Sequence, residues 1–172
     1  MKQAPYERID ASPRFDGRIR NTHEMRYHLA AGFVREGDFV LDACCGSGYG
    51  KRILCRATEA YLGVDKAPPK GDDFRRVDFE TGEGMEDWGP DIFVGLEGIE
   101  HLHDDGVQRF VAAALMATHT IVVSTPIIPN RNRYHKQQFR EEEIPELFAV
   151  CDWQHFGTLH QNDHYGLFVF RR

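Results

Sequence analysis

A glycine-rich turn between a short apolar run and a helical segment constrains the fold of this chain more than any other feature. The apolar run and the turn occupy residues 39–50, which read FVLDACCGSGYG. A strand that ends in a glycine turn and leads into a helix presents free backbone N–H groups and the positive end of a helix dipole to a polar or anionic ligand. The sequence therefore predicts a nucleotide-type cofactor site at the end of this strand.

Length and composition narrow the class of protein to which such a site can belong. The 172 residues have the usual size of one domain, so we expect a single domain spanning residues 1–172. No run approaches the roughly 18 apolar residues of a membrane span, and no signal peptide is expected. The four cysteines form neither a disulfide ladder nor a CxxC zinc pattern, which predicts a reducing, cytoplasmic location. A net charge of −6 disfavours bulk electrostatic binding of long nucleic acid.

The pattern of polar and apolar residues divides the domain into three parts. We expect residues 1–20 to form an N-terminal arm or lid, residues 21–35 a leading helix and residues 39–172 the core. The arm is polar and has no sustained period. In the leading helix, Asn21 occupies a capping position and Glu24 follows three residues later, as in a capping box.

Alternation of strand-like and helix-like segments predicts the fold class. The expected strands are residues 39–43, 60–65, 74–79, 91–96, 119–124, 154–159 and 165–170. Helices follow the first, fourth and fifth of these, and Asp104 or Asp105 is expected to cap the second such helix. Residues 66–73 and 80–90 are too short and too rich in glycine or proline for full crossover helices. The prediction is an α/β, Rossmann-like, mostly parallel sheet of about seven strands, with helices on both faces and a C-terminal antiparallel hairpin.

Carboxylates stand at the ends of the predicted strands, where a ligand of such a sheet would lie. Asp65 comes 19 residues after the first glycine of the turn, and its two oxygens can accept both ribose hydroxyls. Asp78 can receive an adenine amino group while Phe79 packs on the purine. For Asp42 and Cys45, two interpretations stay open, direct cofactor contact or satisfaction of backbone groups at the strand end. The glycine spacing differs from the dinucleotide fingerprint, which disfavours NAD.

Together these motifs resemble the class I S-adenosylmethionine-dependent methyltransferases, among them the small methyltransferase type 11-like domains. The resemblance rests on Arg26-Tyr27 and on residues 40–50, 63–65, 77–78, 91–102 and 124–126. It implies that the glycine turn holds the methionine part of S-adenosylmethionine, and that Glu97 lies near the methionine end. The expected cofactor-binding residues are Asp42, Cys45, Gly46, Ser47, Gly48, Asp65, Lys66, Asp78, Phe79 and Glu97.

A second group of candidate residues follows the fourth predicted strand. Glu97, Glu100 and His101 share one face of a helical turn, and His135 lies in the loop after the fifth strand. Carboxylates with imidazoles suit Mg²⁺ or Mn²⁺ better than zinc. The Glu-x-x-Glu-His run and the later histidine resemble ubiquinone-pathway O-methyltransferases and small-RNA 3′-terminal 2′-O-methyltransferases, in which they are associated with a divalent metal. The alternative is a metal-free site in which His101 orients the loop and His135 acts as the base.

Methyl transfer depends mainly on orienting a nucleophile toward the sulfonium methyl group. A base or a metal helps only when the acceptor must lose a proton, as a hydroxyl does. We therefore expect O-methylation of a small molecule, sugar or lipid-linked intermediate, with His135 and His101 as catalytic residues. Two alternatives stay open: a metal-dependent 2′-O-methyltransferase of RNA ends, and a non-catalytic, S-adenosylmethionine-binding regulatory module.

The loop after the fifth predicted strand is locally basic. It contains Arg131, Arg133, Lys136 and Arg140. These side chains could meet a phosphate or carboxylate of the substrate, or they could form an ordinary solvated surface loop.

Overall fold

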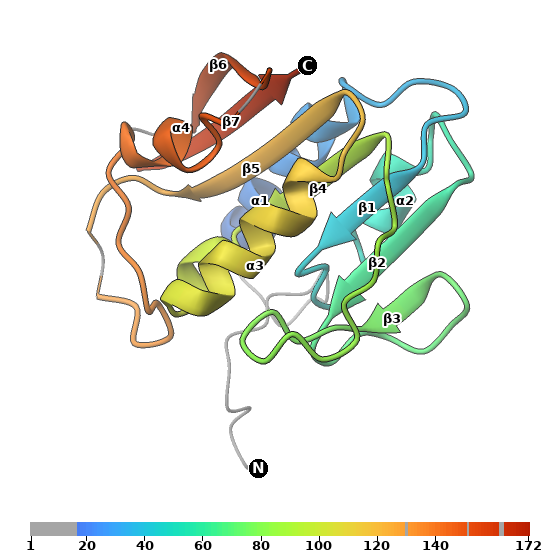
Figure 1. Cartoon of the computed structure of the whole chain (residues 1–172), viewed down its shortest axis with the longest axis horizontal. Coiled ribbons are helices and arrows are strands. Elements are labelled where there is room, and N and C mark those ends of the chain that lie inside the picture. Colours follow the sequence, from blue (N-terminus) through green and yellow to red (C-terminus); the bar gives the residue numbers. More distant parts are fainter. Residues whose placement is uncertain (1–16, 130, 151, 162–163) are drawn as a thin grey trace.

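One seven-stranded sheet with helices on both faces forms the described part of the protein (Figure 1). This computed structural model describes residues 17–129, 131–150, 152–161 and 164–172. In chain order the elements are α1 (Gly17–Ala31), β1 (Val40–Ala43), α2 (Lys51–Leu54), β2 (Tyr61–Asp65), β3 (Phe74–Arg76), β4 (Ile92–Leu96), the 3-10 turn η1 (Ile99–His101), α3 (Asp104–Leu115), β5 (Thr120–Pro126), α4 (Glu143–Leu147), β6 (Gln154–Gln161) and β7 (Tyr165–Arg171). Within those ranges no helix has the length and apolar character needed to cross a membrane.

The strand order places a switch point in the middle of the sheet. The order is β3-β2-β1-β4-β5-β7-β6, and β1 pairs in parallel with both β2 and β4. From β1 the chain builds outward through β2 and β3, and then returns to build the other half from β4. Only β7 runs antiparallel to its two neighbours, β5 and β6. The predicted fold class is confirmed, and the switch point between β1 and β4 is where such sheets bind ligands.

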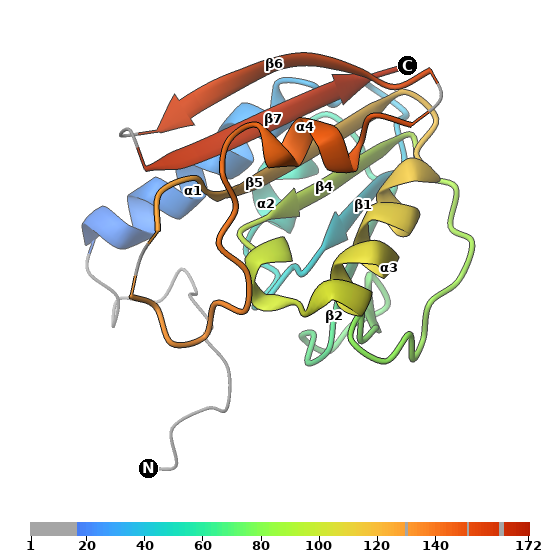
Figure 2. The ribbon, with the colours of Figure 1, turned by 60° about the vertical axis from the view of Figure 1, so that its left-hand side comes forward.

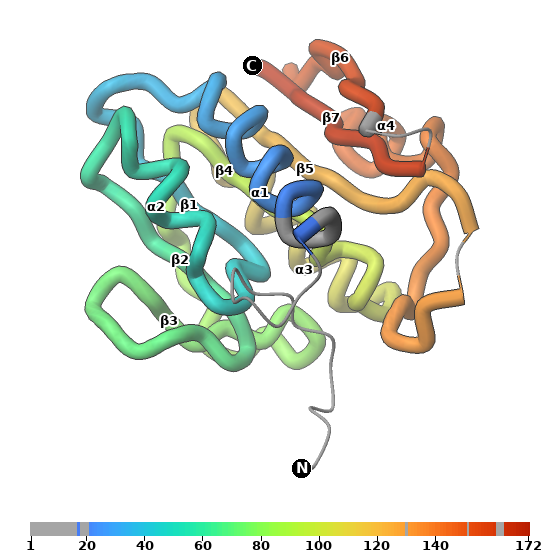
Figure 3. Tube along the Cα trace, turned by 180° about the vertical axis from the view of Figure 1, so that it is seen from behind, coloured from blue at the N-terminus to red at the C-terminus, as the bar shows by residue number. Residues whose placement is uncertain are grey.

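Both faces of the sheet are covered, so the central strands are apolar on both sides. In Figure 2, α3 and α4 cover one face, and Figure 3 shows α1 and α2 on the other. Along β4, Phe93 packs on Phe110 of α3 with ring centroids 5.1 Å apart, while Ile92 and Val94 face the cluster that contains Ala30 of α1. This double burial explains why every residue of β4 and β5 is buried and why both strands are rich in Ile, Val, Leu or Phe.

Helix α1 begins earlier than the sequence pattern predicts. It starts at Gly17, and Asn21 lies inside it, so the predicted capping box at Asn21 is wrong. The Glu24 carboxylate instead pairs with Arg52 of α2. No proline interrupts residues 17–21, so nothing prevents the helix from extending toward the N-terminus. The remainder of the predicted arm, residues 1–16, lies outside the described residues.

The N-terminus of α3 also differs from the expected cap. The capping position is His103, and Asp104 and Asp105 both lie in the first helical turn, where they still face the positive end of the helix dipole. Glu80 takes the place of a capping side chain, because its Oε1 accepts the backbone N–H of His103 at 3.0 Å. The prediction that an aspartate caps this helix is therefore wrong.

The connections after β2 and β3 contain no helix, as predicted. Strand β3 ends at Arg76, three residues earlier than expected, because Asp78 pairs with Glu83 across a tight turn. Arg109 of α3 donates hydrogen bonds to the carbonyls of Phe79 and Glu80, at 3.2 and 2.6 Å. Helix α3 thus supports the segment that a crossover helix would otherwise hold in place.

Candidate active site

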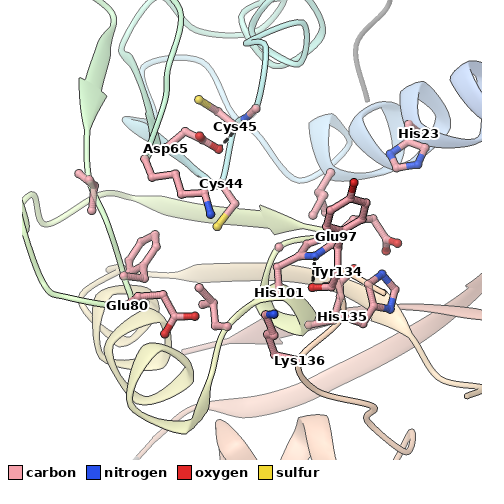
Figure 4. Close-up of a pocket in the computed structure, with 18 of the residues that line it drawn as sticks. His23, Cys44, Cys45, Asp65, Glu80, Glu97, His101, Tyr134, His135 and Lys136 are labelled. Carbon is pink, nitrogen blue, oxygen red and sulfur yellow. Dashed lines mark hydrogen bonds between the residues drawn. The ribbon is translucent and has the colours of Figure 1, made fainter. Parts of the chain in front are cut away.

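A cavity of about 380 Å³ lies at the carboxyl ends of β1, β2 and β4 (Figure 4). Most of the predicted site residues line it, namely Cys45, Gly46, Asp65, Lys66, Asp78, Phe79, Glu97, Glu100, His101 and His135. Asp42, Ser47 and Gly48 do not. Figure 4 shows Asp65 and Cys45 at one end, and Glu97, Tyr134 and His135 toward the other. The volume is within the range of small-molecule and cofactor sites.

The glycine turn presents its backbone to the cavity at Gly46. Gly46 has a φ of 56°, and a Cβ built there meets no atom within 4 Å, so a side chain would project into open space. Gly48, with a φ of 73°, has another role, because a Cβ there would lie 2.7 Å from the Phe74 ring and 2.8 Å from Pro69. Only Gly46 of these two glycines leaves room for a ligand against the backbone.

Two residues that are not glycine adopt the left-handed conformation at the ends of the central strands. Cys44 follows β1 with a φ of 58°, and Glu97 follows β4 with a φ of 54°. The adjacent Gly98 is required because a Cβ there would lie 2.8 Å from the Cys44 sulfur. Such strain concentrates at functional sites, and both residues line the cavity. Burial raises the pKa of the Cys44 thiol well above its ordinary value, so it is a neutral wall rather than a nucleophile.

Asp65 joins the glycine turn to the end of β2. Its Oδ2 accepts the N–H of Gly46 at 3.1 Å, and its Oδ1 accepts the N–H of Ala67 at 2.9 Å. Each carboxylate oxygen has a second lone pair, so the same group can also accept two hydroxyls from a ribose in the cavity. These two hydrogen bonds fix the orientation of the Asp65 carboxylate at the cavity wall.

Asp78 and Phe79 lie in the turn that follows β3. The Asp78 Oδ1 accepts the N–H of Glu80 at 2.9 Å, which fixes the carboxylate at the cavity wall. Phe79 is only 3% exposed, and its ring packs against Phe110 with centroids 5.5 Å apart. Phe79 is therefore part of the hydrophobic core and offers one edge to the cavity.

Asp42 lies fully buried and anchors two tyrosines. The hydroxyl of Tyr27, from α1, donates to its Oδ1 at 3.2 Å, and the hydroxyl of Tyr61, from β2, donates to its Oδ2 at 2.8 Å. Burial raises the pKa of Asp42 to about 7. The Tyr27 ring also packs onto Gly50, where any Cβ would collide with it. Asp42 thus connects α1 to the glycine turn.

Replacing Asp42 with asparagine is expected to remove a pH-dependent loss of stability. Because the pKa of Asp42 is about 7 in the folded chain, against its ordinary value of 3.8, the unfolded chain loses this proton first as the pH rises. The free energy of unfolding therefore falls by on the order of 4 kcal/mol as the pH rises from 3.8 to about 7. The asparagine side chain does not ionise, so the variant lacks this decline. Urea unfolding across this range should show Asp42→Asn becoming more stable relative to the unsubstituted chain as the pH rises.

Asp152→Asn is the control for this experiment. A hydrogen bond from the Arg172 side chain lowers the pKa of Asp152, so this exposed carboxyl is ionised in both states above about pH 5. Its replacement should give a stability difference that does not change from there to pH 8. A constant difference for Asp42→Asn as well would contradict the buried, neutral carboxyl.

Glu97 is held by a buried arginine that the sequence motifs did not assign to the site. Arg26 of α1 is 1% exposed, and its Nε lies 3.7 Å from the Glu97 Oε1, which also accepts the Ser124 hydroxyl at 2.9 Å. The Arg26 guanidinium stacks on the Tyr165 ring, 4.2 Å from its centroid. No nitrogen of Arg26 has a hydrogen-bond partner among the described residues. A buried cation with free donors faces the back of the cavity wall at this end.

Further cavity residues were not predicted as site residues from the sequence. Among them are His23, Tyr49, Tyr134 and Tyr165. His23 shares the face of α1 that carries Arg26 and Tyr27, a helical spacing that could have indicated it. Burial, and then the charge of Arg26, lower the pKa of His23 to about 3, so its imidazole is neutral and a weak base. No sequence feature near Tyr165 indicates a site residue, because only the pairing of β7 with β5 brings Tyr165 to the cavity.

His101 and His135 meet beside Glu100 on the loop side of the cavity. The His101 Nδ1 lies 3.2 Å from the Tyr134 carbonyl, which can only accept, so Nδ1 carries the proton and Nε2 the lone pair. The two imidazole rings are 4.9 Å apart, edge to face. Burial, and then the charge of Glu97, raise the pKa of Glu100 well above its ordinary value.

These three residues could also hold a metal ion. Ligand atoms of Glu100, His101 and His135 lie within 4.8 Å of one another. The fourth predicted ligand, Glu97, is outside this group, with its carboxylate toward Ser124 and Arg26. Two imidazoles and one carboxylate form a softer donor set than the predicted one, and suit Zn²⁺ or Mn²⁺ better than Mg²⁺.

Comparison with known proteins agrees with this fold. No family model matches the chain. A probable S-adenosylmethionine-dependent methyltransferase of Mycolicibacterium smegmatis is 28% identical over 156 residues, and the match covers 80% of this chain and 60% of that protein. The chain therefore spans about three fifths of the length of this relative.

Solved structures with a similar fold include several methyltransferases. One is the 1,6-didemethyltoxoflavin N1-methyltransferase of Burkholderia thailandensis with bound 1,6-didemethyltoxoflavin and S-adenosylhomocysteine, with a TM-score of 0.66, 20% identity, and coverage of 91% of this chain and 82% of that chain. Another is the small RNA methyltransferase HEN1, with a TM-score of 0.66, 19% identity, and coverage of 96% of this chain and 26% of that chain. These similarities show that the chain has the fold of S-adenosylmethionine-dependent methyltransferases.

Proposed function

We propose that this protein transfers a methyl group from S-adenosylmethionine to a hydroxyl group of a small molecule, sugar or lipid-linked intermediate. One observation carries the proposal: a single cavity contains a carboxylate suited to a ribose, Asp65, and a pair of imidazoles, His101 and His135. Nitrogen or carbon acceptors that are already nucleophilic need no base, whereas a hydroxyl does. The imidazole pair therefore favours an oxygen acceptor.

The residues of the cavity fit the cofactor part by part. Asp65 would accept the ribose hydroxyls, and Asp78 and Phe79 would contact the adenine. The open space beside Gly46 would admit the methionine part, and Glu97, oriented by Arg26, would lie near its end. When bound, S-adenosylmethionine supplies an electrophilic methyl group on a sulfonium. The protein orients the acceptor in line with that methyl group and excludes water.

His101 is the residue best placed to take the acceptor proton. Its Nδ1–H is held by the Tyr134 carbonyl, so the basic Nε2 has a fixed orientation. The proton of the acceptor hydroxyl would move to this nitrogen as the oxygen becomes nucleophilic. His135, whose ring packs edge to face with His101, would help to orient it.

Two measurements test the proposal. Calorimetry with S-adenosylmethionine and S-adenosylhomocysteine should show binding of both, and failure of both to bind would refute it. A screen of hydroxyl acceptors with methyl-labelled cofactor should then identify a product. Cofactor binding without transfer to any acceptor would instead favour the non-catalytic regulatory module.

The metal-dependent methylation of an RNA 2′-hydroxyl end is a second candidate, favoured by the Glu100, His101 and His135 group. A metal held there would lower the pKa of an acceptor hydroxyl and replace the base. The fold similarity to a small RNA methyltransferase is consistent with this candidate. Because burial keeps the pKa of Glu100 raised, metal binding must release its proton.

If this second candidate is right, metal-free protein should bind Mn²⁺ or Zn²⁺ more tightly as the pH rises. Glu100→Gln and His135→Ala should each lower that affinity at least about tenfold, because each removes one of three ligands. His28→Ala, on the exposed face of α1, is the control and should bind metal as the unsubstituted chain does. Transfer to a short RNA that survives a chelator would exclude a metal role.

A further inference from the structure

The loop after β5 lines the cavity with side chains that differ from those at the ends of β2 and β3. Tyr134, His135 and Lys136 line the cavity from this loop, whereas the ends of β2 and β3 contribute Asp65 and Asp78. In Figure 4, Lys136 lies below His101, on the opposite side of the view from Asp65. In the proposed reaction, the cofactor would occupy the side of Asp65 and Asp78. The loop wall would then face the acceptor.

The basic residues of this loop are not equivalent. Arg140 pairs with Glu142 at 3.3 Å and with Glu143 at 2.9 Å, so its charge is compensated. Arg133 stacks on the Tyr134 ring, 4.8 Å from its centroid, and donates to its hydroxyl at 2.6 Å. Two of the four basic side chains are thus already engaged within the protein.

Lys136 is the one basic residue of this loop, among residues 131–140, that lines the cavity. Its backbone N–H donates to the Glu100 carbonyl at 2.8 Å, as that of Gln137 does at 3.0 Å, which fixes the base of its side chain beside η1. Among the residues that the structure describes, no carboxylate pairs with its ammonium group. A lysine at a cavity wall without an acidic partner suits a ligand with its own negative charge.

Aromatic rings from this loop and from the start of β7 line the cavity beside Lys136. Tyr134 has one face against Arg133, and Tyr165 has one face against Arg26, so neither ring can turn without breaking a cation–π contact. His135 is held edge to face by His101. Flat, immobilised rings favour a planar aromatic ligand over a flexible or bulky one.

We propose that the acceptor is a planar aromatic compound that carries a carboxylate or phosphate, which pairs with Lys136, and a hydroxyl, which faces His101. This inference rests on the proposed methyltransferase function and adds the class of substrate. An RNA chain would need a row of available cations for successive phosphates, but Arg133 and Arg140 are engaged internally and Arg131 does not line the cavity. Lys136 is thus the single cation that this loop presents to the cavity, and it matches one anionic group on a small molecule.

Binding of small probes to the protein saturated with S-adenosylhomocysteine tests the inference without knowledge of the true acceptor. The probes are 3-hydroxybenzoate, 3-hydroxyphenyl phosphate, the neutral 3-hydroxybenzamide and the non-planar 3-hydroxycyclohexanecarboxylate. At least one aromatic anion should bind about tenfold more tightly than both the amide and the cyclohexane compound. The first two probes distinguish a carboxylate from a phosphate.

Lys136→Gln should remove this tenfold preference and leave the affinity for S-adenosylhomocysteine unchanged. Arg140→Gln removes the same charge from the same loop and should keep the preference, because Arg140 is paired with acids. Equal affinities for anionic and neutral probes, or a preference that survives Lys136→Gln, would overturn the inference. So would a short oligoribonucleotide that binds more tightly than every probe. Failure of S-adenosylhomocysteine itself to bind would instead overturn the proposed function.

Discussion

Replacing Asp65 with alanine should lower the affinity for S-adenosylhomocysteine by about 100-fold or more. Hydrogen bonds to a charged group contribute about 1.5–3 kcal/mol each, and in the proposed site the substitution would remove two that the ribose donates. It also leaves the N–H groups of Gly46 and Ala67 without their acceptor, so the glycine turn loses its attachment to β2. Calorimetry gives the affinity, and circular dichroism checks that the variant is folded.

Asp72→Ala controls for the change in net charge. Asp72 is exposed in the loop after β2 and does not line the cavity, so its loss should leave cofactor affinity unchanged. Asp65→Asn keeps one acceptor oxygen, so its cofactor affinity should lie between those of Asp65→Ala and Asp72→Ala. An Asp65→Ala protein that binds the cofactor normally would remove the main support for the site.

Replacing His101 with alanine should lower kcat by about 10²- to 10⁴-fold, the usual contribution of a general base, while cofactor affinity stays within about threefold. The reason is that, in the proposed arrangement, His101 would face the acceptor, whereas Asp65 and Gly46 would contact the cofactor. The rate is measured with the acceptor that the labelled-cofactor screen identifies. The pH profile of kcat should also lose the limb that belongs to the imidazole.

His28→Ala is the matched histidine control, since His28 is exposed on α1 and outside the cavity. Its kcat and pH profile should be those of the unsubstituted chain. A loss of cofactor affinity as large as the loss of rate for His101→Ala would identify His101 as a support of the cofactor loop rather than a base.

Those parts of the site that depend on residues close together in the sequence could be predicted from it. The strand, the glycine turn and the acid at the end of the next strand are local features, and parallel pairing of β1 with β2 necessarily brings Asp65 to the turn. The Glu100 and His101 pair is local for the same reason. The absence of full helices after β2 and β3 followed from short, glycine-rich and proline-rich connections.

What could not be predicted depends on tertiary pairing and on which side of a turn faces the ligand. Tyr165 reaches the site only because β7 pairs with β5, and Arg26 only because α1 crosses behind β4. The sequence cannot distinguish Gly46 from Gly48 within the glycine turn. In the structure Gly46 lines the cavity, whereas Gly48 packs on Phe74. The burial of Asp42 under two tyrosines is equally a property of the assembled layers.

The contact of Tyr27 with Gly50 and Asp42 has a consequence for local unfolding. Helix α1 cannot detach without withdrawing a hydroxyl from a buried carboxyl and uncovering the turn, so α1 and the turn open together. A ligand that binds only the closed arrangement then protects both. Amide hydrogens in α1 should exchange more slowly in proportion to ligand concentration above its Kd, which makes this helix a remote reporter of occupancy at the strand ends.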